Sequence, residues 1–375
     1  MNKETITHTA SIFSQMTQLA QEYAAINLAQ GFPNMPIDTK LRHCVEDAFR
    51  AENDQYSPFQ GSLNLRNEIT QLIHRNSGED CPPHQILVTA GATQAIFTSI
   101  QALVSRGDEV ILLDPCYDCY ELPVILVGAH PVHVPLNSEY LPDWERIEKA
   151  ITPKTRMIII NSPHNPSGRV WKEKEFHTLG ALMQKYERLL VLSDEVYEYL
   201  AFDVVHVSVR SFEKIKSRSV VVSSFGKSLQ ATGWKIGYLS ASEELLISIL
   251  KVHQYMVFSV NSFLQEGIAN YLKAFHAQEV KETYLAKRNL FVEGLAASKF
   301  EALPCEGTYF QTASFRQISH QSDVAFARWL TKEVGVAAIP VSVFNKDQMD
   351  RKHVRFCFAK TDETLFEALE RLCNL

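Results

Sequence analysis

Residues 223–238 read Ser-Ser-Phe-Gly-Lys-Ser-Leu-Gln-Ala-Thr-Gly-Trp-Lys-Ile-Gly-Tyr, and this stretch decides the fold. The apolar run 220–222 directly before it predicts a buried parallel strand, so Lys227 falls just beyond the carboxyl end of that strand. Open α/β sheets bind their ligands at this edge. A desolvated lysine amine there can form a Schiff base with a carbonyl group, whereas a lone lysine after a strand is usually a solvated charge. Lys227 therefore needs support from the rest of the chain.

Similar apolar runs recur along the chain and alternate with helical patterns. The helical patterns cover residues 93–106, with Gly107 as the expected C-cap, and residues 176–186. This alternation predicts an α/β fold in which helices sandwich a mostly parallel, seven-stranded sheet. The expected strands are residues 86–89, 109–113, 132–135, 157–160, 189–192, 220–222 and 236–239.

After about residue 275 the pattern changes to one long amphipathic helix, followed by short strands and helices. We expect strands near 308–312, 337–340 and 354–358 and helices near 322–334 and 362–372, which together form a smaller α+β domain. The predicted large domain therefore spans residues 41–275. Residues 1–40 and 276–375 are predicted to form the small domain.

The composition limits the possible partners and compartments. The chain has 375 residues, of which 46% are hydrophobic and 21% are charged, and it has no apolar stretch long enough to predict a membrane span. A net charge of −6 without a run of basic residues argues against a nucleic-acid partner. Seven cysteines, an odd number, fit a reducing compartment better than a disulfide framework. The first 25 residues mix Lys3, Glu4 and Glu22 among apolar residues and show no secretory signal, so we expect a cytoplasmic protein. Cys116 and Cys119 lack further zinc ligands at a suitable spacing, so no metal site is predicted.

Polar residues follow two further predicted strands. Asp194 comes directly after the run 189–192, and Tyr197 lies three residues further on. An aspartate at this edge can pair with a protonated ring nitrogen, although it could equally cap a helix. Asn165 also follows a strand end; its amide could bind a ring oxygen, but Asn-Pro is a common turn pair.

Other residues suit anionic groups. Gly91, Ala92 and Thr93 join a strand to a helix, where backbone N–H groups and the helix dipole favour phosphate, and Ser224 and Lys235 could add a hydroxyl and a cation. Arg355 is flanked by apolar residues in a strand-like run. A buried arginine there would bind a carboxylate, which could belong to the protein or to a substrate.

Taken together, these residues resemble the fold-type I pyridoxal-phosphate aminotransferases of class I/II, essentially from end to end. The resemblance rests on the spacings Asp194-x-x-Tyr197 and Ser224-x-x-Lys227, on Lys235 and on the late Arg355. It extends to residues 27–33 (NLAQGFP), 55–61 (QYSPFQG), 90–93 (AGAT), 114–117 (DPCY) and 307–310 (GTYF). Residues 164–168 (HNPSG) and 336–342 (VAAIPVS) are most similar to the bacterial methionine aminotransferases and the kynurenine/glutamine aminotransferases.

The resemblance implies a role for each of these residues. Lys227 would form the Schiff base with pyridoxal 5′-phosphate and move the substrate proton. Asp194 would pair with the ring nitrogen, and Tyr197 and Asn165 would hold the ring 3-oxygen. The resemblance further implies phosphate contacts from Ala92, Thr93, Ser224 and Lys235, with Tyr56 reaching in from the other subunit of a homodimer. It implies substrate contacts from Gly31, Asn165, Arg355, Tyr56, Phe258 and Tyr117. Tyr117 would also stack on the cofactor ring.

The implied activity moves an amino group from an L-amino acid to a 2-oxo acid by ping-pong kinetics, with pyridoxamine 5′-phosphate as the half-reaction form. The aromatic wall of Tyr56, Tyr117 and Phe258 favours methionine, aromatic or glutamine-like donors over aspartate. A cysteine-conjugate β-lyase using the same site is the alternative. A DNA-binding regulator would need a module before Asn27, for which about 25 residues leave no room. A nicotinamide dehydrogenase would need a G-x-G-x-x-G after the first strand, which the sequence lacks.

Overall fold

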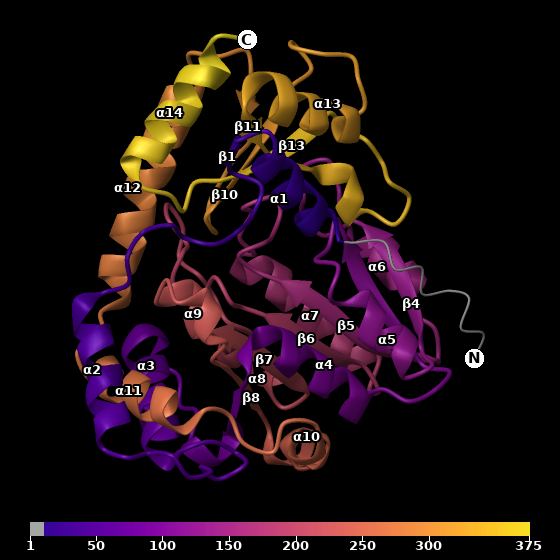
Figure 1. The fold of residues 1–375 in the computed structure, drawn as a ribbon. Helices are drawn as coiled ribbons and strands as arrows, with labels where there is room; N and C mark the ends of the chain where they lie inside the picture. The colour runs from indigo at the N-terminus through magenta and orange to yellow at the C-terminus, as the bar shows by residue number, and fades with distance from the viewer. Residues whose placement is uncertain (1–10) are drawn as a thin grey trace.

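A seven-stranded sheet runs through the centre of the protein in the computed structural model, which describes residues 11–375 (Figure 1). The strands lie in the order β2-β8-β7-β6-β5-β3-β4, and all are parallel except β8, which is antiparallel to both β2 and β7. The predicted mostly parallel, seven-stranded sheet is therefore confirmed. The strands are β2 (Ile86–Thr89), β3 (Glu109–Asp114), β4 (His130–Pro135), β5 (Thr155–Asn161), β6 (Leu190–Asp194), β7 (Ser219–Ser224) and β8 (Gly237–Ala241).

Helices cover both faces of this sheet, which explains why the central strands are apolar without alternation. In β5, Met157 and Ile159 pack into one hydrophobic core together with α4 (Gly91–Leu103) and α10 (Glu243–Met256). Ile158 and Ile160 point the other way and pack against α7 (Glu173–Lys185). Because successive side chains of a strand point to opposite faces, a strand buried on both sides needs an unbroken apolar run.

Two smaller sheets lie beside the central sheet, near the long helix α12 (Ala277–Leu295) (Figure 1). One has the order β12-β13-β10-β9, and the other pairs β1 (Ile26–Asn27) with β11 (Val336–Ala337) in parallel. The amino-terminal segment therefore joins a sheet with residues more than 300 positions later. The strands of the four-stranded sheet are β9 (Glu301–Ala302), β10 (Phe310–Ser314), β12 (Ile339–Pro340) and β13 (His353–Cys357).

The remaining helices complete the two parts of the molecule. They are α1 (Ile12–Glu22), α2 (Thr39–Arg50), α3 (Leu63–Ser77), α5 (Glu121–Leu126), α6 (Trp144–Ala150), α8 (Glu213–Lys216), α9 (Phe225–Ser228), α11 (Ser262–Leu272), α13 (Asp323–Trp329) and α14 (Asp362–Cys373). Short 3₁₀ turns occupy Pro83–Gln85, Val209–Ser211, Thr232–Trp234 and Val341–Phe344, and a π-turn occupies Leu330–Val334.

Some predicted boundaries were wrong. Gly107 does not cap the helix: α4 already ends at Leu103, and Gly107 lies in the turn before β3 with a φ of 86°. The single strand expected at 337–340 is two short strands, because Ala337 pairs with Asn27 whereas Ile339 pairs with Arg355 in a different sheet. The helix expected at 322–334 changes from α to π geometry at Leu330.

We expected a large domain of residues 41–275 and a small domain of residues 1–40 and 276–375. The two boundaries of this division fall near the first residues of α2 and α12. Residues 1–10 of the predicted small domain, and the first part of the amino-terminal stretch discussed above, lie outside the described residues. None of the helices within residues 11–375 is long and apolar enough to cross a membrane.

Candidate active site

A cavity of about 450 Å³ opens at the carboxyl ends of β5, β6 and β7. The edge of the sheet predicted from Lys227 is therefore hollow, and side chains from both parts of the molecule meet there. All predicted site residues except two line this cavity: Gly31, Ala92, Thr93, Tyr117, Asn165, Asp194, Tyr197, Ser224, Lys227, Lys235 and Arg355.

Lys227 lies on α9, a single helical turn that follows β7 directly. Its Nζ donates a hydrogen bond to the hydroxyl of Tyr309 at 2.9 Å. Burial lowers the pKa of Lys227 to about 8, an effect that the neighbouring charge of Asp194 only partly offsets. About a tenth of the amine is therefore neutral at pH 7, far more than for an ordinary lysine, and a nucleophile or a base must be neutral.

Asp194 is the last residue of β6, and its buried carboxylate lines the same cavity. Tyr120 donates a hydrogen bond to its Oδ2 at 2.6 Å, and the backbone N–H of Val196 donates to Oδ1 at 3.3 Å. Burial raises the pKa of Asp194 to about 6, against the lowering effect of these two donors and of Lys227. The group is thus mostly an anion near pH 7 and can pair with a cation in the cavity.

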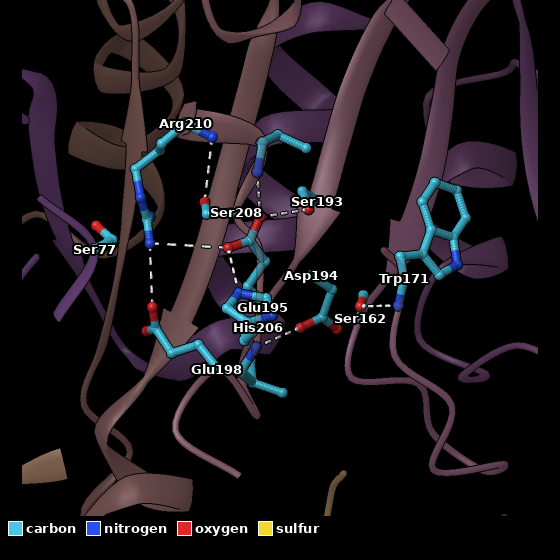
Figure 2. Close-up of polar contacts among 12 residues, drawn as sticks. Ser77, Ser162, Trp171, Ser193, Asp194, Glu195, Glu198, His206, Ser208 and Arg210 are labelled. Carbon is cyan, nitrogen blue, oxygen red and sulfur yellow. Dashed lines mark hydrogen bonds and ion pairs between the residues drawn. The ribbon is translucent and has the colours of Figure 1, made fainter. Parts of the chain in front are cut away.

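A buried ionic network behind Asp194 holds the end of β6 in place (Figure 2). Glu195 lies 3.1 Å from His206 Nε2, and Arg210 lies 3.1 Å from a carboxylate oxygen of Glu198. Burial raises the pKa of Glu195, but His206 and Arg210 outweigh it and hold the pKa at about 2. Glu195 is therefore fully ionised near pH 7, and its negative charge contributes to the raised pKa of Asp194.

The amino terminus of α4 forms another end of the cavity. Ala90 at the N-cap position offers no side-chain hydrogen bond to this terminus, in the structure as described for residues 11–375. A Cβ atom added to Gly91, whose φ is 76°, would lie 3.4 Å from Lys235 Nζ, so the cation stands directly beside the turn. Lys235 itself has a left-handed φ of 55°. Together with Ser224, this arrangement suits a phosphate group.

Arg355 on β13 is 1% exposed, yet no Asp or Glu pairs with it among residues 11–375. Its Nη1 donates to Asn165 Oδ1 at 2.6 Å and its Nη2 to the carbonyl oxygen of Ala29 at 3.1 Å, and its Nε has no partner in the described part of the chain. The guanidinium lies 3.8 Å from the ring centroid of Phe310. A buried cation without an anion is costly, so the arrangement favours a carboxylate supplied by a ligand over a structural one.

Two aromatic rings complete the lining. Tyr197 is buried and packs edge to face against Tyr309, with their ring centroids 5.2 Å apart. Tyr117 packs in the same way against Tyr120 and against Phe13 of α1. The cavity therefore has flat apolar surfaces that suit a planar ring.

Tyr56 and Phe258 are the two predicted residues that do not line the cavity of this chain. Tyr56 is 80% exposed and Phe258 is 46% exposed, and their rings pack edge to face with centroids 5.1 Å apart. The structure thus brings these two residues together on the surface, away from the other predicted site residues.

The sequence prediction missed several residues of the site. Tyr309 and Tyr120 bind Lys227 and Asp194 directly, and the Nδ2 of Asn161 donates to the backbone carbonyl of Asp194 at 2.9 Å. Phe13 and Asp118 line the cavity. Tyr309 lies inside the quoted stretch 307–310, and Asp118 and Tyr120 lie within three residues of the end of 114–117, so proximity to these motifs was the available signal.

Asp114, Cys116 and His133 form a cluster whose donor atoms lie within 4.8 Å of one another. A 2.8 Å hydrogen bond joins Asp114 Oδ1 to His133 Nδ1, and the backbone N–H of Lys346 donates to Asp114 Oδ2. These bonds account for the positions of the Asp114 and His133 side chains. The expectation that the protein has no metal site stays a prediction.

The fold and the cavity define a class: a fold-type I transferase with a lysine at a strand end, an aspartate on the neighbouring strand and an arginine from the smaller part. The family model for aminotransferases of class I and II matches residues 24–372. The chain therefore belongs to the class I and II aminotransferases, and it is an enzyme that transfers an amino group to a 2-oxo acid.

Individual relatives agree over nearly the whole chain. The methionine aminotransferase of Escherichia coli K12 is 42% identical over 97% of this chain and 96% of its own. A probable N-succinyldiaminopimelate aminotransferase of Mycobacterium tuberculosis is 35% identical over 98% and 96%, respectively. Kynurenine–oxoglutarate transaminase 3 of Homo sapiens is 32% identical over 96% and 87%.

Among solved structures, YbdL from Escherichia coli, described as having a methionine aminotransferase function, superimposes with a TM-score of 0.97 at 40% identity, covering 100% of this chain and 99% of its own. The resemblance proposed from the sequence motifs is confirmed at the level of the family.

Proposed function

We propose that this aminotransferase binds pyridoxal 5′-phosphate at Lys227 and takes its amino group from methionine, aromatic or glutamine-like L-amino acids. One observation carries the proposal: the buried guanidinium of Arg355, without an acidic partner among the described residues, lines the same cavity as the lysine with a lowered pKa. An amino acid offers the carboxylate that Arg355 lacks and the amino group with which Lys227 exchanges.

The residues of the cavity fit the three polar parts of the proposed cofactor. The amino terminus of α4, Ser224 and Lys235 would hold the phosphate, and Asp194 would pair with the ring nitrogen. Tyr197 and Asn165 would hold the ring oxygen, with Tyr117 against the ring face. When bound, pyridoxal phosphate supplies an electron sink for the electron pair of a substrate Cα–H bond.

The protein's own residues orient the substrate and move its proton. Arg355 would bind the α-carboxylate bidentately and so fix which bond of Cα faces Lys227. Lys227 Nζ would accept the proton from Cα, hold it, and return it two atoms further along, beyond the nitrogen, in a 1,3-transfer. The carboxylate of Asp194 keeps positive charge on its partner favourable throughout, because hydrogen bonds from Tyr120 and from the backbone N–H of Val196 hold it as a buried anion. A second substrate, a 2-oxo acid, would use the same contacts in reverse order.

The cavity lining supports a neutral side chain on the donor. The cations among the described lining residues are Lys227, Lys235 and Arg355, and each already has a proposed role. The acidic residue Asp118 also lines the cavity. An acidic donor would therefore meet a like charge without a free cation, whereas a thioether or an aromatic ring would contact Phe13 and Tyr117.

A homodimer with shared active sites would complete this wall. Tyr56 and Phe258 form an exposed aromatic pair outside the cavity of their own chain. We propose that this pair reaches the phosphate and the substrate side chain in the partner's site, as the motif around Tyr56 implies.

Two further points are proposals of the same kind. The relatives described above are all named as aminotransferases or transaminases, which favours transamination over the β-lyase alternative. A cytoplasmic location is supported by the seven cysteines, all of which are free thiols, as a reducing compartment requires.

The test starts with the purified protein and its absorption spectrum. A visible band that is bleached by methionine and restored by a 2-oxo acid is the expected result. Values of kcat/KM for methionine, phenylalanine, glutamine and aspartate with one 2-oxo acid then rank the donors, and Asp118→Asn should raise the aspartate-to-methionine ratio. Release of ammonia and pyruvate from a cysteine conjugate without a 2-oxo acid would favour the lyase. Aspartate leading the series would refute the proposed donor class.

A further inference from the structure

Tyr309 links the amine of Lys227 to the backbone of the amino-terminal segment. Its hydroxyl accepts a hydrogen bond from Lys227 Nζ at 2.9 Å and donates one to the carbonyl oxygen of Gly31 at 2.8 Å. Tyr309 is fully buried and directly precedes β10. Nothing in the motifs or in the general chemistry of the site assigns a role to this hydroxyl.

The direction of these two bonds is fixed by chemistry. A carbonyl oxygen can only accept, so the single hydroxyl hydrogen of Tyr309 is committed to Gly31. The hydroxyl can therefore only accept from Lys227, and it occupies an N–H of the amine but never its lone pair. A base must present exactly that lone pair to the proton that it removes.

We propose that Tyr309 is the positioning residue of Lys227: held by Gly31, it anchors one N–H of the free amine and turns the nitrogen lone pair toward the Cα–H bond of the substrate. In the proton transfer, the Cα–H bond breaks and an N–H bond forms on Lys227. The electron pair goes to the electron sink named above, and Tyr309 neither gains nor loses a proton. This inference rests on the proposed function.

The Tyr309 hydroxyl is an uncharged acceptor, and this affects the pKa of Lys227. A carboxylate in this position would stabilise the ammonium form and raise the pKa of Lys227, whereas a phenol holds the amine with a weaker preference for its charged form. Burial keeps Tyr309 in this neutral form, because it raises the pKa of the phenol well above its ordinary value. The rings of Tyr309 and Tyr197 pack edge to face with centroids 5.2 Å apart, so Tyr309 also contacts the residue proposed for the ring oxygen.

A neighbouring tyrosine provides a matched control. Tyr284 is also fully buried, and its ring lies 5.8 Å from that of Tyr309, but its hydroxyl has no hydrogen-bond partner within the described residues. Tyr309→Phe and Tyr284→Phe therefore remove the same atom from the same aromatic cluster, and only the first breaks bonds to Lys227 and Gly31.

The experiment compares both variants with the wild-type holoenzyme. For Tyr309→Phe we expect kcat with methionine to fall roughly tenfold or more while KM changes less than about threefold, and the isotope effect of α-deuterated methionine on kcat to increase. Tyr284→Phe should match the wild type in all three. Equal behaviour of the two variants, or a change in KM alone, would overturn the proposal.

A second measurement does not use the activity of the loaded enzyme. The rate at which cofactor-free protein recombines with pyridoxal phosphate follows the neutral fraction of the Lys227 amine. Loss of an acceptor lowers the pKa of that amine, so the pH midpoint of this rate should fall by about half a unit to one unit in Tyr309→Phe and stay unchanged in Tyr284→Phe. A slower kcat with a more neutral amine identifies positioning, and an unmoved midpoint contradicts it.

The outcomes also separate this inference from the proposed function. A wild-type protein without a visible band or transamination would refute the function itself, whereas an active wild type with an equally active Tyr309→Phe refutes only the role of Tyr309. Should Tyr309→Phe fail to fold, 3-fluorotyrosine at position 309 keeps both bonds but weakens the acceptor. It should then show a smaller increase of the same isotope effect, and the absence of any increase would count against the proposal.

Discussion

Tyr120 donates its phenolic hydrogen to Asp194 Oδ2 at 2.6 Å, and both residues line the cavity. Because this bond stabilises the ionised carboxylate, Tyr120→Phe should raise the pKa of Asp194 further above its present value of about 6. We expect the acid limb of the kcat/KM profile to move up by about one pH unit and the activity at pH 8 to change much less.

The control for this prediction is Tyr140→Phe. The hydroxyl of Tyr140 also makes a buried hydrogen bond, to His353 Nδ1 at 2.7 Å, but Tyr140 does not line the cavity. A profile for Tyr120→Phe that overlays the wild type, or an equal displacement in Tyr140→Phe, would show that the bond to Asp194 does not control the acid limb.

The two lysines of the site should fail in different ways. Lys227→Ala should lower transamination at least about 1,000-fold while the protein still binds pyridoxal phosphate through its phosphate contacts. Lys235→Ala should instead weaken cofactor binding and recover most of its turnover at saturating cofactor, because Lys235 lies at the amino terminus of α4. Equilibrium dialysis and assays at increasing cofactor concentration distinguish the two, and near wild-type turnover in Lys227→Ala would refute its assignment.

Subunit mixing tests the shared site. Tyr56→Ala and Lys227→Ala homodimers should both be inactive, but a heterodimer has one site that lacks both lesions. Mixed and re-associated subunits should therefore regain up to about a quarter of the wild-type activity, since half of the dimers are mixed and each has one intact site of two. A fully active monomer in sedimentation, or no recovery after confirmed exchange, contradicts the shared site.

His164 should make the protein less stable in mild acid. Its Nε2 lies 2.9 Å from the carbonyl oxygen of Pro115, and burial lowers its pKa from 6.5 to about 4, against the opposing effect of that bond. The unfolded chain therefore takes up a proton below pH 6.5 that the folded protein refuses until about pH 4. The free energy of unfolding is therefore unaffected by His164 well above pH 6.5, and it decreases as the pH falls from 6.5 toward 4.

Between pH 7 and pH 5 the loss is about 2 kcal/mol in the free energy of unfolding. Urea unfolding of the wild type and of His164→Asn at both pH values measures it, and the variant should lose about 2 kcal/mol less. An equal loss in both proteins would show that His164 is not kept neutral by the fold.

The sequence predicted those parts of the structure that local pattern controls. The run Met157 to Ile160 had to be a strand buried on both sides, and the strand-to-helix turn at Gly91 had to expose backbone N–H groups. It could not predict which strands pair, because Asn27 and Ala337 meet over more than 300 residues. The contacts of Tyr120 and Tyr309 were missed for the same reason: they span 74 and 82 residues, and nothing in the spacing of a buried tyrosine names its partner.

The guanidinium of Arg355 lies close to the rings of Phe310, Phe13 and Phe344 and has no acidic partner among residues 11–375. This has a practical consequence for kinetic studies of the enzyme. We expect a small carboxylate from the medium to bind this guanidinium at the place proposed for the substrate carboxylate. Acetate, citrate or formate buffers should therefore act as competitive inhibitors, whereas amine buffers should not. A bound carboxylate also stabilises the buried Arg355 cation in the folded state, so the same buffers should raise the melting temperature of the protein.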